Sequence, residues 1–200
     1  MWGRFRISIF KLTKKDTGKY GLFPEKVIER ADELSRHVSL YYDTNVEKYS
    51  CSFYINGEMI EIPYRVYYDI NRIKINKVSE SEKIMIHCIG TRNHNGFLRQ
   101  EHLELLLTYE FLYWTVPYII KICDEYVIQI LEIVYSDLSK RDTKIFKEFT
   151  AENPEMIKKS YSRMVSYWNA YYRRKYPNLK GYVGYKIFKE HFDYCIEHKL

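Results

Sequence analysis

The sequence predicts an α+β N-terminal region over residues 1–78, with a small antiparallel sheet and one helix, followed by a helical solenoid of about three helix pairs over 79–200. Two observations lead to this prediction: a tight hairpin signal at Asn56-Gly57, and three similar apolar helical stripes. The stripes begin at Leu98, Val127 and Ile157, which lie 29 and 30 residues apart. Such a period is typical of stacked helix pairs, because no pair can bury its apolar face alone.

The first elements follow from local patterns. Phe5, Ile7 and Ile9 alternate with polar residues, which is the two-residue period of a half-buried strand. Pro24 suits the first turn of a helix, where its missing N–H costs nothing. The helix after it would present one apolar face, formed by Val27, Ala31, Leu34, Val38 and Tyr41.

The hairpin prediction includes its register. Asn56-Gly57 supplies the two positive-φ residues of a type I′ turn. Folding about it places Phe53 opposite Ile60, Cys51 opposite Ile62 and Tyr49 opposite Tyr64 on one face, with Ser52–Glu61 and Lys48–Arg65 on the other. A slip of one residue would mix the two faces, so the register is specified. Pro63 lacks a donor and favours an edge strand.

The helical part opens with Ser79 followed by Glu82, which fits a capping box. Gly90 ends that helix, and a loop from Thr91 leads to the next. The expected later helices are residues 97–107, 118–123, 126–138, 143–149 and 155–172, with a last helix at 185–198. The three stripes on them comprise Leu98, His102, Leu105 and Leu106; Val127, Leu131, Val134 and Tyr135; and Ile157, Tyr161, Met164 and Val165.

Residues 79–172 contain stretches that resemble HEAT-type repeats. The order apolar–Arg–x–x in Leu98-Arg99-Gln100-Glu101 resembles the start of the second repeat helix, although His102 stands where a small residue is usual. The run from Pro117 to Val127, with its acidic turn Asp124-Glu125, matches the proline, apolar helix and turn of a repeat. Ile128 replaces the usual Arg, and the third unit has Lys158 near that position. The resemblance implies a HEAT-like α-solenoid without naming a ligand.

Composition and charge narrow the class of protein. The chain is 46% hydrophobic and 29% charged, and it contains 21 Tyr residues. This composition is typical of a globular protein. None of its four cysteines forms a CxxC pair, and no apolar run reaches membrane-spanning length, so we expect a cytoplasmic protein. From Met156 to Lys189 there are nine basic residues and no acidic one, which would attract an acidic partner or a polyanion.

The basic aromatic segment, residues 156–189, is the first candidate site. Cations can meet phosphates while aromatic faces stack on bases, so this mixture suits nucleic acid. One alternative is a packed end of the helical domain, in which the Lys and Arg stems cover buried rings. Another is a surface that binds an acidic protein. The candidate binding residues in this segment are Lys158, Arg163, Trp168, Tyr171, Tyr172, Arg173, Arg174, Lys175 and Tyr176.

A second candidate is the loop from Arg92 to Gly96, where His94, Asn95 and Arg99 lie near a helix N-terminus that favours anions. The alternative is an inter-helix turn in which Arg99 bonds either a neighbouring repeat or a carbonyl group. His191, Cys195 and His198 would share one helix face, but zinc usually needs four ligands, so we expect no metal. We also expect no cofactor, and the sequence has no phosphate loop, nucleophile elbow or metalloprotease motif.

The sequence therefore favours a non-enzymatic protein-binding scaffold, with inhibition of another protein, as in a bacterial immunity protein, as one use. The alternative is a nucleic-acid-binding protein that uses residues 156–189, with DNA-repair-type base chemistry by analogy of fold.

Overall fold

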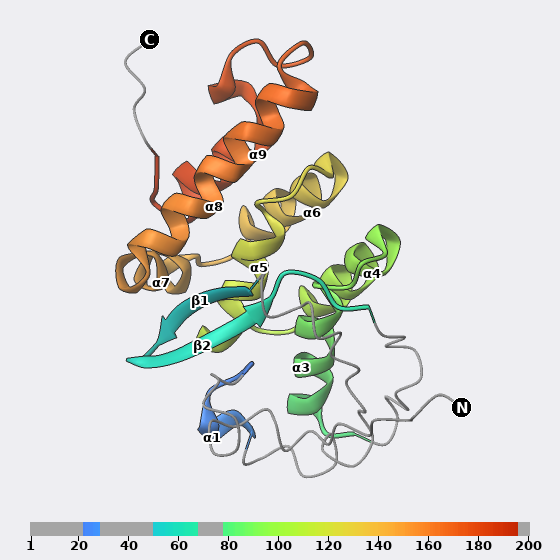
Figure 1. The fold of residues 1–200 in the computed structure, drawn as a ribbon, viewed down its shortest axis with the longest axis vertical. Coiled ribbons are helices and arrows are strands. Elements are labelled where there is room, and N and C mark those ends of the chain that lie inside the picture. Colours follow the sequence, from blue (N-terminus) through green and yellow to red (C-terminus); the bar gives the residue numbers. More distant parts are fainter. Residues whose placement is uncertain (1–21, 29–49, 68–77, 196–200) are drawn as a thin grey trace, which may run out of the picture. The chain divides into compact units, whose positions relative to one another are not determined.

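The computed structural model describes residues 22–28, 50–67 and 78–195. The chain divides into two compact units, residues 1–109 and 110–200 (Figure 1). The sequence prediction assigned the first helix pair, within residues 79–107, to the second domain. In the structure this pair belongs to the same unit as the hairpin. Within the described ranges no helix is long and apolar enough to cross a membrane.

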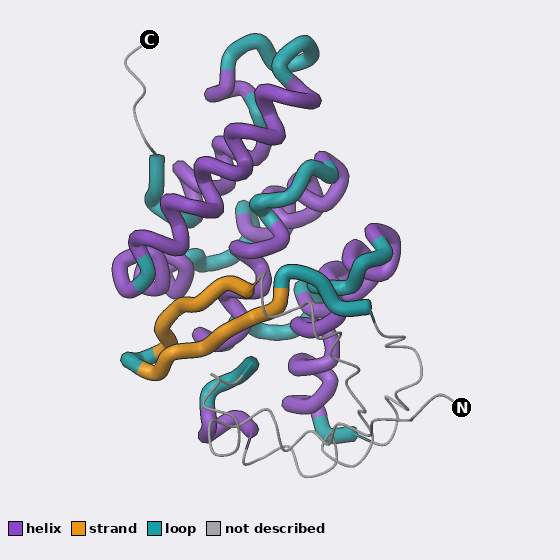
Figure 2. Tube along the Cα trace, viewed as in Figure 1, coloured by secondary structure: helices purple, strands orange, loops and turns teal. Residues whose placement is uncertain are grey.

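The hairpin of the first unit has the predicted turn and register. Strand β1, Ser50–Ile55, pairs antiparallel with β2, Glu58–Pro63 (Figure 2). Asn56 and Gly57 both have positive φ, 51° and 80°, as a type I′ turn requires. Phe53 lies opposite Ile60 and Cys51 opposite Ile62, which confirms the predicted register. The strand expected at Phe5–Ile9, the partner positions Lys48 and Tyr49, and the predicted helix beyond α1, Glu25–Ile28, lie outside the described residues.

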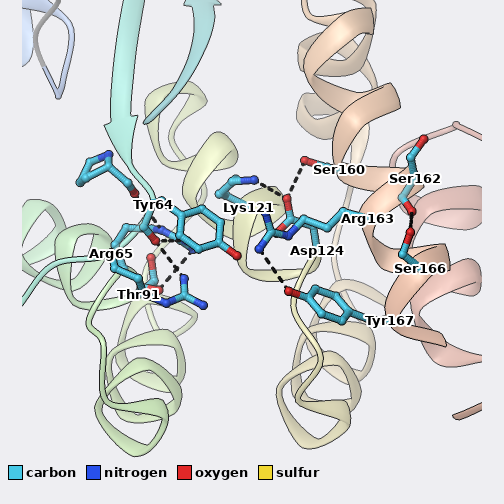
Figure 3. Close-up of polar contacts among 12 residues, drawn as sticks. Tyr64, Arg65, Thr91, Lys121, Asp124, Ser160, Ser162, Arg163, Ser166 and Tyr167 are labelled. Atoms are coloured by element: carbon cyan, nitrogen blue, oxygen red, sulfur yellow. Dashed lines mark hydrogen bonds and ion pairs between the residues drawn. The ribbon is translucent and has the colours of Figure 1, made fainter. Parts of the chain in front are cut away.

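A buried arginine holds the hairpin to the helices that follow. The Arg92 side chain is fully buried and donates to the carbonyl oxygens of Pro63 and Tyr64, at 3.4 and 2.8 Å. Beside it, Val66 and Asn93 form a short parallel bridge, in which the Val66 N–H donates to the Arg92 carbonyl at 2.8 Å. Figure 3 shows this group around Tyr64 and Thr91. Because a buried guanidinium needs acceptors, the end of β2 must stay within its reach.

The first helix pair comprises α3, Glu80–Gly90, and α4, Gly96–Leu106, which pack against each other. The predicted capping box is present: the Ser79 hydroxyl accepts from the Glu82 N–H, and the Glu82 carboxylate accepts from the Ser79 N–H at 2.8 Å. His87 of α3 and His102 of α4 meet in the buried contact, with their Nδ1 atoms 2.9 Å apart. The His102 ring lies so close to Gly90 that a Cβ there would come within 2.2 Å of its Cγ.

The second unit begins with a 3₁₀ turn, Tyr113–Thr115, and contains α5, Val116–Ile122; α6, Ile128–Leu138; α7, Lys144–Glu152; and α8, Pro154–Tyr167. A π-helical turn, Trp168–Tyr172, continues α8 as far as the sequence predicts helix. The helices of each predicted pair, α5–α6 and α7–α8, contact each other. The three predicted helix pairs are therefore present. Their arrangement as one HEAT-like stack stays a prediction.

The C-terminal segment packs into the second unit. Helix α9, Val183–Lys186, runs into a π turn, Ile187–His191, and contacts both α6 and α8 (Figure 2). Five of its aromatic and apolar side chains are buried, namely Tyr182, Tyr185, Ile187, Phe188 and Phe192. The predicted helix at 185–198 is wrong in its extent, because the helical turns end at His191 and Asp193 takes a positive φ of 54°. His191 and Cys195 thus do not share a helix face, and His198 lies outside the described residues.

The stripes are buried in most of their members. His102 and Leu106, Leu131 and Val134, and Ile157, Tyr161 and Met164 are buried. Leu105 is wrong as a core position, because its side chain is 39% exposed. The buried face of α4 is shifted relative to the predicted stripe, because Arg99 and Leu103 are buried together with His102 and Leu106.

We expect Gly90→Ala to destabilise the first unit by about 1–3 kcal/mol, because a new methyl group would overlap the His102 ring in a packed interface. Urea unfolding of the two proteins would measure this difference. Gly181→Ala is the matched control, since a Cβ there meets open space. Equal losses for the two variants would contradict the predicted overlap.

The histidine pair predicts a pH dependence of folding. Burial, and for His87 also the neighbouring His102, lowers the pKa of both imidazoles to about 4. Two Nδ1 atoms at 2.9 Å can share one proton, and a second would place two donors face to face. Above the unfolded pKa of about 6.5 both states are neutral, so stability is complete. As the pH falls toward 4 the unfolded chain binds protons that the folded chain excludes, so stability is lost.

We therefore expect the free energy of unfolding to fall by up to about 1.4 kcal/mol per pH unit for each imidazole between pH 6.5 and 5. Urea unfolding at several pH values would measure the slope. The double variant His87→Asn/His102→Asn should show a flatter profile over this window. An unchanged slope in that variant would assign the pH dependence to other groups.

Candidate aromatic and basic binding surface

Three tyrosines form an exposed cluster in the second unit, called here the tyrosine surface. Tyr126 lies in the turn between α5 and α6, Tyr167 ends α8, and Tyr171 lies in the π turn. The Tyr126 ring centroid lies 5.8 Å from that of Tyr167 and 5.9 Å from that of Tyr171, and Tyr167 stacks on Tyr171 at 6.1 Å. Tyr126 is 47% and Tyr171 is 64% exposed. The rings are thus ordered by one another while part of their apolar area faces solvent.

The π turn that carries Tyr171 is itself unusual. π-helical turns are rare and lie mostly within α-helices, frequently at functional sites. Here the turn also brings Tyr172 to the start of α6, where the N-cap residue Val127 offers no side-chain acceptor. The Tyr172 hydroxyl accepts from the Ile128 N–H at 3.3 Å and donates to the Tyr126 carbonyl. It therefore caps α6 from a distant part of the chain and holds the turn that carries Tyr126.

Arg163 supports the tyrosine surface from one turn earlier in α8. Its Nη2 lies 3.2 Å from the Tyr167 hydroxyl, and its guanidinium carbon lies 5.6 Å from the centroid of the same ring. Its Nε lies 3.7 Å from Oδ1 of Asp124 (Figure 3). Arg163 was predicted as a binding residue and is about one-third exposed, so it reaches both the surface and the interior.

Asp124, in the turn after α5, is a fully buried carboxylate. Lys121, near the end of α5, donates to Oδ2 of Asp124. The Ser160 hydroxyl of α8 donates to the same oxygen at 3.1 Å (Figure 3). From the sequence, Asp124-Glu125 was expected to form an acidic turn. The sequence offered no means to find this ion cluster, because its members lie up to 42 positions apart, from Lys121 to Arg163.

The exposed cations follow the tyrosine surface along the chain. Arg173, Arg174 and Lys175 are exposed. Arg173 lies over the Trp168 ring at 6.0 Å and donates to Asn169 at 3.1 Å, and Lys175 lies over the Tyr176 ring at 5.3 Å. These three side chains place positive charge beside the tyrosine surface. Lys158, also predicted, is exposed on α8.

The remaining predicted aromatic residues are used inside the unit. The Trp168 Nε1 donates to the Tyr176 carbonyl at 2.9 Å. Tyr172 stacks on the buried Tyr182 at 5.4 Å, and Tyr176 contacts the same ring at 5.7 Å. Burial also raises the pKa of the Tyr182 hydroxyl well above its usual range. Trp168, Tyr172 and Tyr176 thus brace the surface rather than form its most exposed part.

The loop residues of the first unit have structural contacts. Arg99 is buried, and its Nη1 donates to the Asn93 and His94 carbonyls at 2.9 and 3.0 Å, as the alternative interpretation of this loop expected. Asn95 is the N-cap of α4 and accepts from the Phe97 N–H at 2.9 Å. His94 is exposed and stacks on Tyr67 at 5.2 Å. Anion binding at this loop stays a prediction.

Within the described residues, no group of three His, Cys, Asp or Glu side chains is placed to hold a metal ion. His191 lies 3.4 Å from the Ser139 hydroxyl, but that hydroxyl donates to the Tyr135 carbonyl at 2.7 Å. Burial lowers the pKa of His191. Cys88 and Cys123 are buried, and burial raises the pKa of both thiols. Neither thiol is therefore disposed to act as a nucleophile.

No known protein family, curated protein or solved structure matches this chain.

We expect Tyr172→Phe to destabilise the second unit by about 1–3 kcal/mol, because the Ile128 N–H at the start of α6 would lose its acceptor. Urea unfolding would measure the loss. Tyr171→Phe is the matched control, since Tyr171 is the most exposed of the cluster and surface changes usually stay within about 0.5 kcal/mol. A neutral Tyr172→Phe would contradict the capping role.

Proposed function

We propose that this protein binds a protein partner through the tyrosine surface, and that the partner presents an acidic segment to the neighbouring cations. The observation that carries the proposal is the exposed cluster of Tyr126, Tyr167 and Tyr171 with Arg163 against it. Tyrosine and arginine are enriched among the residues that contribute most to protein interfaces. Rings already ordered before binding lose little conformational freedom on association.

The geometry favours a protein partner over nucleic acid. Stacking with bases needs open ring faces. Arg173 lies over Trp168, Tyr182 covers one face of Tyr172, and Lys175 lies over Tyr176. Tyr167 has Arg163 and Tyr171 against it. These contacts leave Tyr126 and Tyr171 as the rings most open to solvent, and two exposed tyrosines with hydroxyl groups and cations around them suit the mixed polar and apolar contacts of a protein interface.

Charge supports an acidic partner. Arg173, Arg174 and Lys175 are exposed beside the tyrosine surface, in a segment without acidic residues. Such a patch would speed association with an acidic protein and discriminate against basic ones. Exposed cations contribute more to the rate of encounter than to the lifetime of the complex, which the tyrosines would set.

The proposed scaffold is a HEAT-like stack of helix pairs. Its support within the second unit is the contact between Asp124, in the turn of the α5–α6 pair, and Arg163, on α8 of the next pair. The Asp124–Arg163 ion pair stands in for the repeated Arg–Asp contact of HEAT-type repeats, for which positions 128 and 158 lack the arginine. A rigid scaffold that covers an acidic functional surface of another protein would act as an inhibitor, and an immunity protein is one such case.

We expect the full-length chain to bind poly-L-glutamate, a probe for an acidic protein segment, with an affinity that falls as salt rises. Tyr126→Ala and Tyr171→Ala should each weaken binding about tenfold, because each removes contact area from the centre of the surface. The triple reversal Arg173→Glu/Arg174→Glu/Lys175→Glu should mainly slow association. Stopped-flow and equilibrium fluorescence anisotropy would measure the rate constants and the affinity.

The matched control is Lys140→Glu/Lys144→Glu/Lys147→Glu, which makes the same change of net charge at exposed positions around the start of α7. Equal effects of the two triple variants would reduce the interaction to net charge and contradict the proposed surface. A single-stranded oligonucleotide of matched charge provides the other arm. Tighter binding of the oligonucleotide than of poly-L-glutamate, lost in Tyr171→Ala, would favour the nucleic-acid function instead.

A further inference from the structure

We infer that Asp124 is a positioning residue for the tyrosine surface, acting through Arg163 on Tyr167. The inference rests on the proposed function for its binding consequence, while the positioning itself can be measured without a partner. Asp124 lies wholly in the interior and would touch no ligand.

The contacts form a continuous path from the interior to the surface. Oδ1 of Asp124 lies 3.7 Å from Nε of Arg163, and Nη2 of Arg163 lies 3.2 Å from the Tyr167 hydroxyl. The Tyr167 ring then contacts both Tyr126 and Tyr171. Two of these residues, Asp124 and Tyr126, also share the turn between α5 and α6. The carboxylate thus holds one tyrosine through Arg163 and lies two residues from another along the backbone.

An arginine without this contact would explore many rotamers. Its planar guanidinium has fixed donor directions, so a carboxylate that holds one nitrogen orients the others as well. Here Nε and Nη2 lie along one edge of the guanidinium, and they face Asp124 and the Tyr167 hydroxyl respectively (Figure 3). Since ordering a flexible side chain on association costs free energy, a surface that is ordered beforehand binds more tightly.

The two carboxylate oxygens allow the positioning role to be separated from simple support of the fold. Oδ2 accepts from Lys121 and from the Ser160 hydroxyl, whereas Oδ1 faces Arg163. Ser160→Ala therefore removes a buried contact to the same carboxylate and leaves its contact with Arg163. Asp124→Asn keeps the shape of the side chain and removes the charge that orients Arg163.

The test uses the full chain with poly-L-glutamate and three variants, Asp124→Asn, Arg163→Lys and their combination. We expect each single variant to weaken binding about fivefold to tenfold, and the double variant to be no weaker than the poorer single one, because both act on one path. Asp124→Asn makes the protein more positive, so a general charge effect would tighten binding to this probe. Ser160→Ala should lower the free energy of unfolding with little change in affinity.

A second readout needs no ligand. With 3-fluorotyrosine at position 167 alone, the ¹⁹F resonance should shift and broaden in Asp124→Asn and Arg163→Lys, and stay unchanged in Ser160→Ala. Absence of probe binding by the wild-type chain would count against the proposed function, and the ¹⁹F spectra would still test the positioning. Wild-type affinity and an unchanged resonance in folded Asp124→Asn would overturn the inference. Should that variant not fold, Arg163→Lys decides by the same two readouts.

Discussion

The second unit is organised around one constraint, the burial of the Asp124 carboxylate. A charge removed from water is tolerated only when cations and hydrogen-bond donors converge on it. Lys121, Ser160 and Arg163 meet this requirement, and two of them belong to α8. The turn after α5 and the middle of α8 must therefore lie together, which also brings Tyr126 beside Tyr167. The exposed aromatic cluster is in this sense a consequence of an internal charge.

Local chemistry made the hairpin and the helix starts predictable. Asn56-Gly57 fixes a turn whose geometry permits one register, and Ser79 with Glu82 satisfies the first N–H groups of α3 within four residues. These devices depend on neighbours in sequence, so a pattern search can find them. The same applies to Pro24 and Asn95, each of which stands at the start of a helix.

The partners of buried charges were not predictable in the same way. The sequence predicts Arg92 and Arg99 as part of an anion-binding loop, yet both are buried and donate to backbone carbonyls. Tyr172 caps α6 from 44 positions away, and no local motif signals such a cap. The last helix was predicted too long because its apolar period continues past His191, whereas the backbone turns at Asp193. Each of these features depends on tertiary contacts rather than on the local pattern.

By composition, residues 156–189 form one aromatic and basic segment. In the structure its side chains differ in burial and therefore in role. Tyr161, Tyr182 and Phe188 belong to the core, so their rings contribute hydrophobic stabilisation. Trp168, Tyr172 and Tyr176 brace the turn that follows α8. Tyr171, with Tyr126 from another part of the chain, is the aromatic area that faces solvent.

The cations also differ in burial, and only the exposed ones can contact a partner. A guanidinium that is buried against carbonyl groups, as in Arg92 and Arg99, contributes little to the potential felt by an approaching molecule. Arg173, Arg174 and Lys175 remain exposed, and they lie within four residues of Tyr171. Positive potential and exposed aromatic area thus coincide at one place in the second unit. That coincidence, more than the total charge of the chain, is the physical reason to seek an acidic protein partner there.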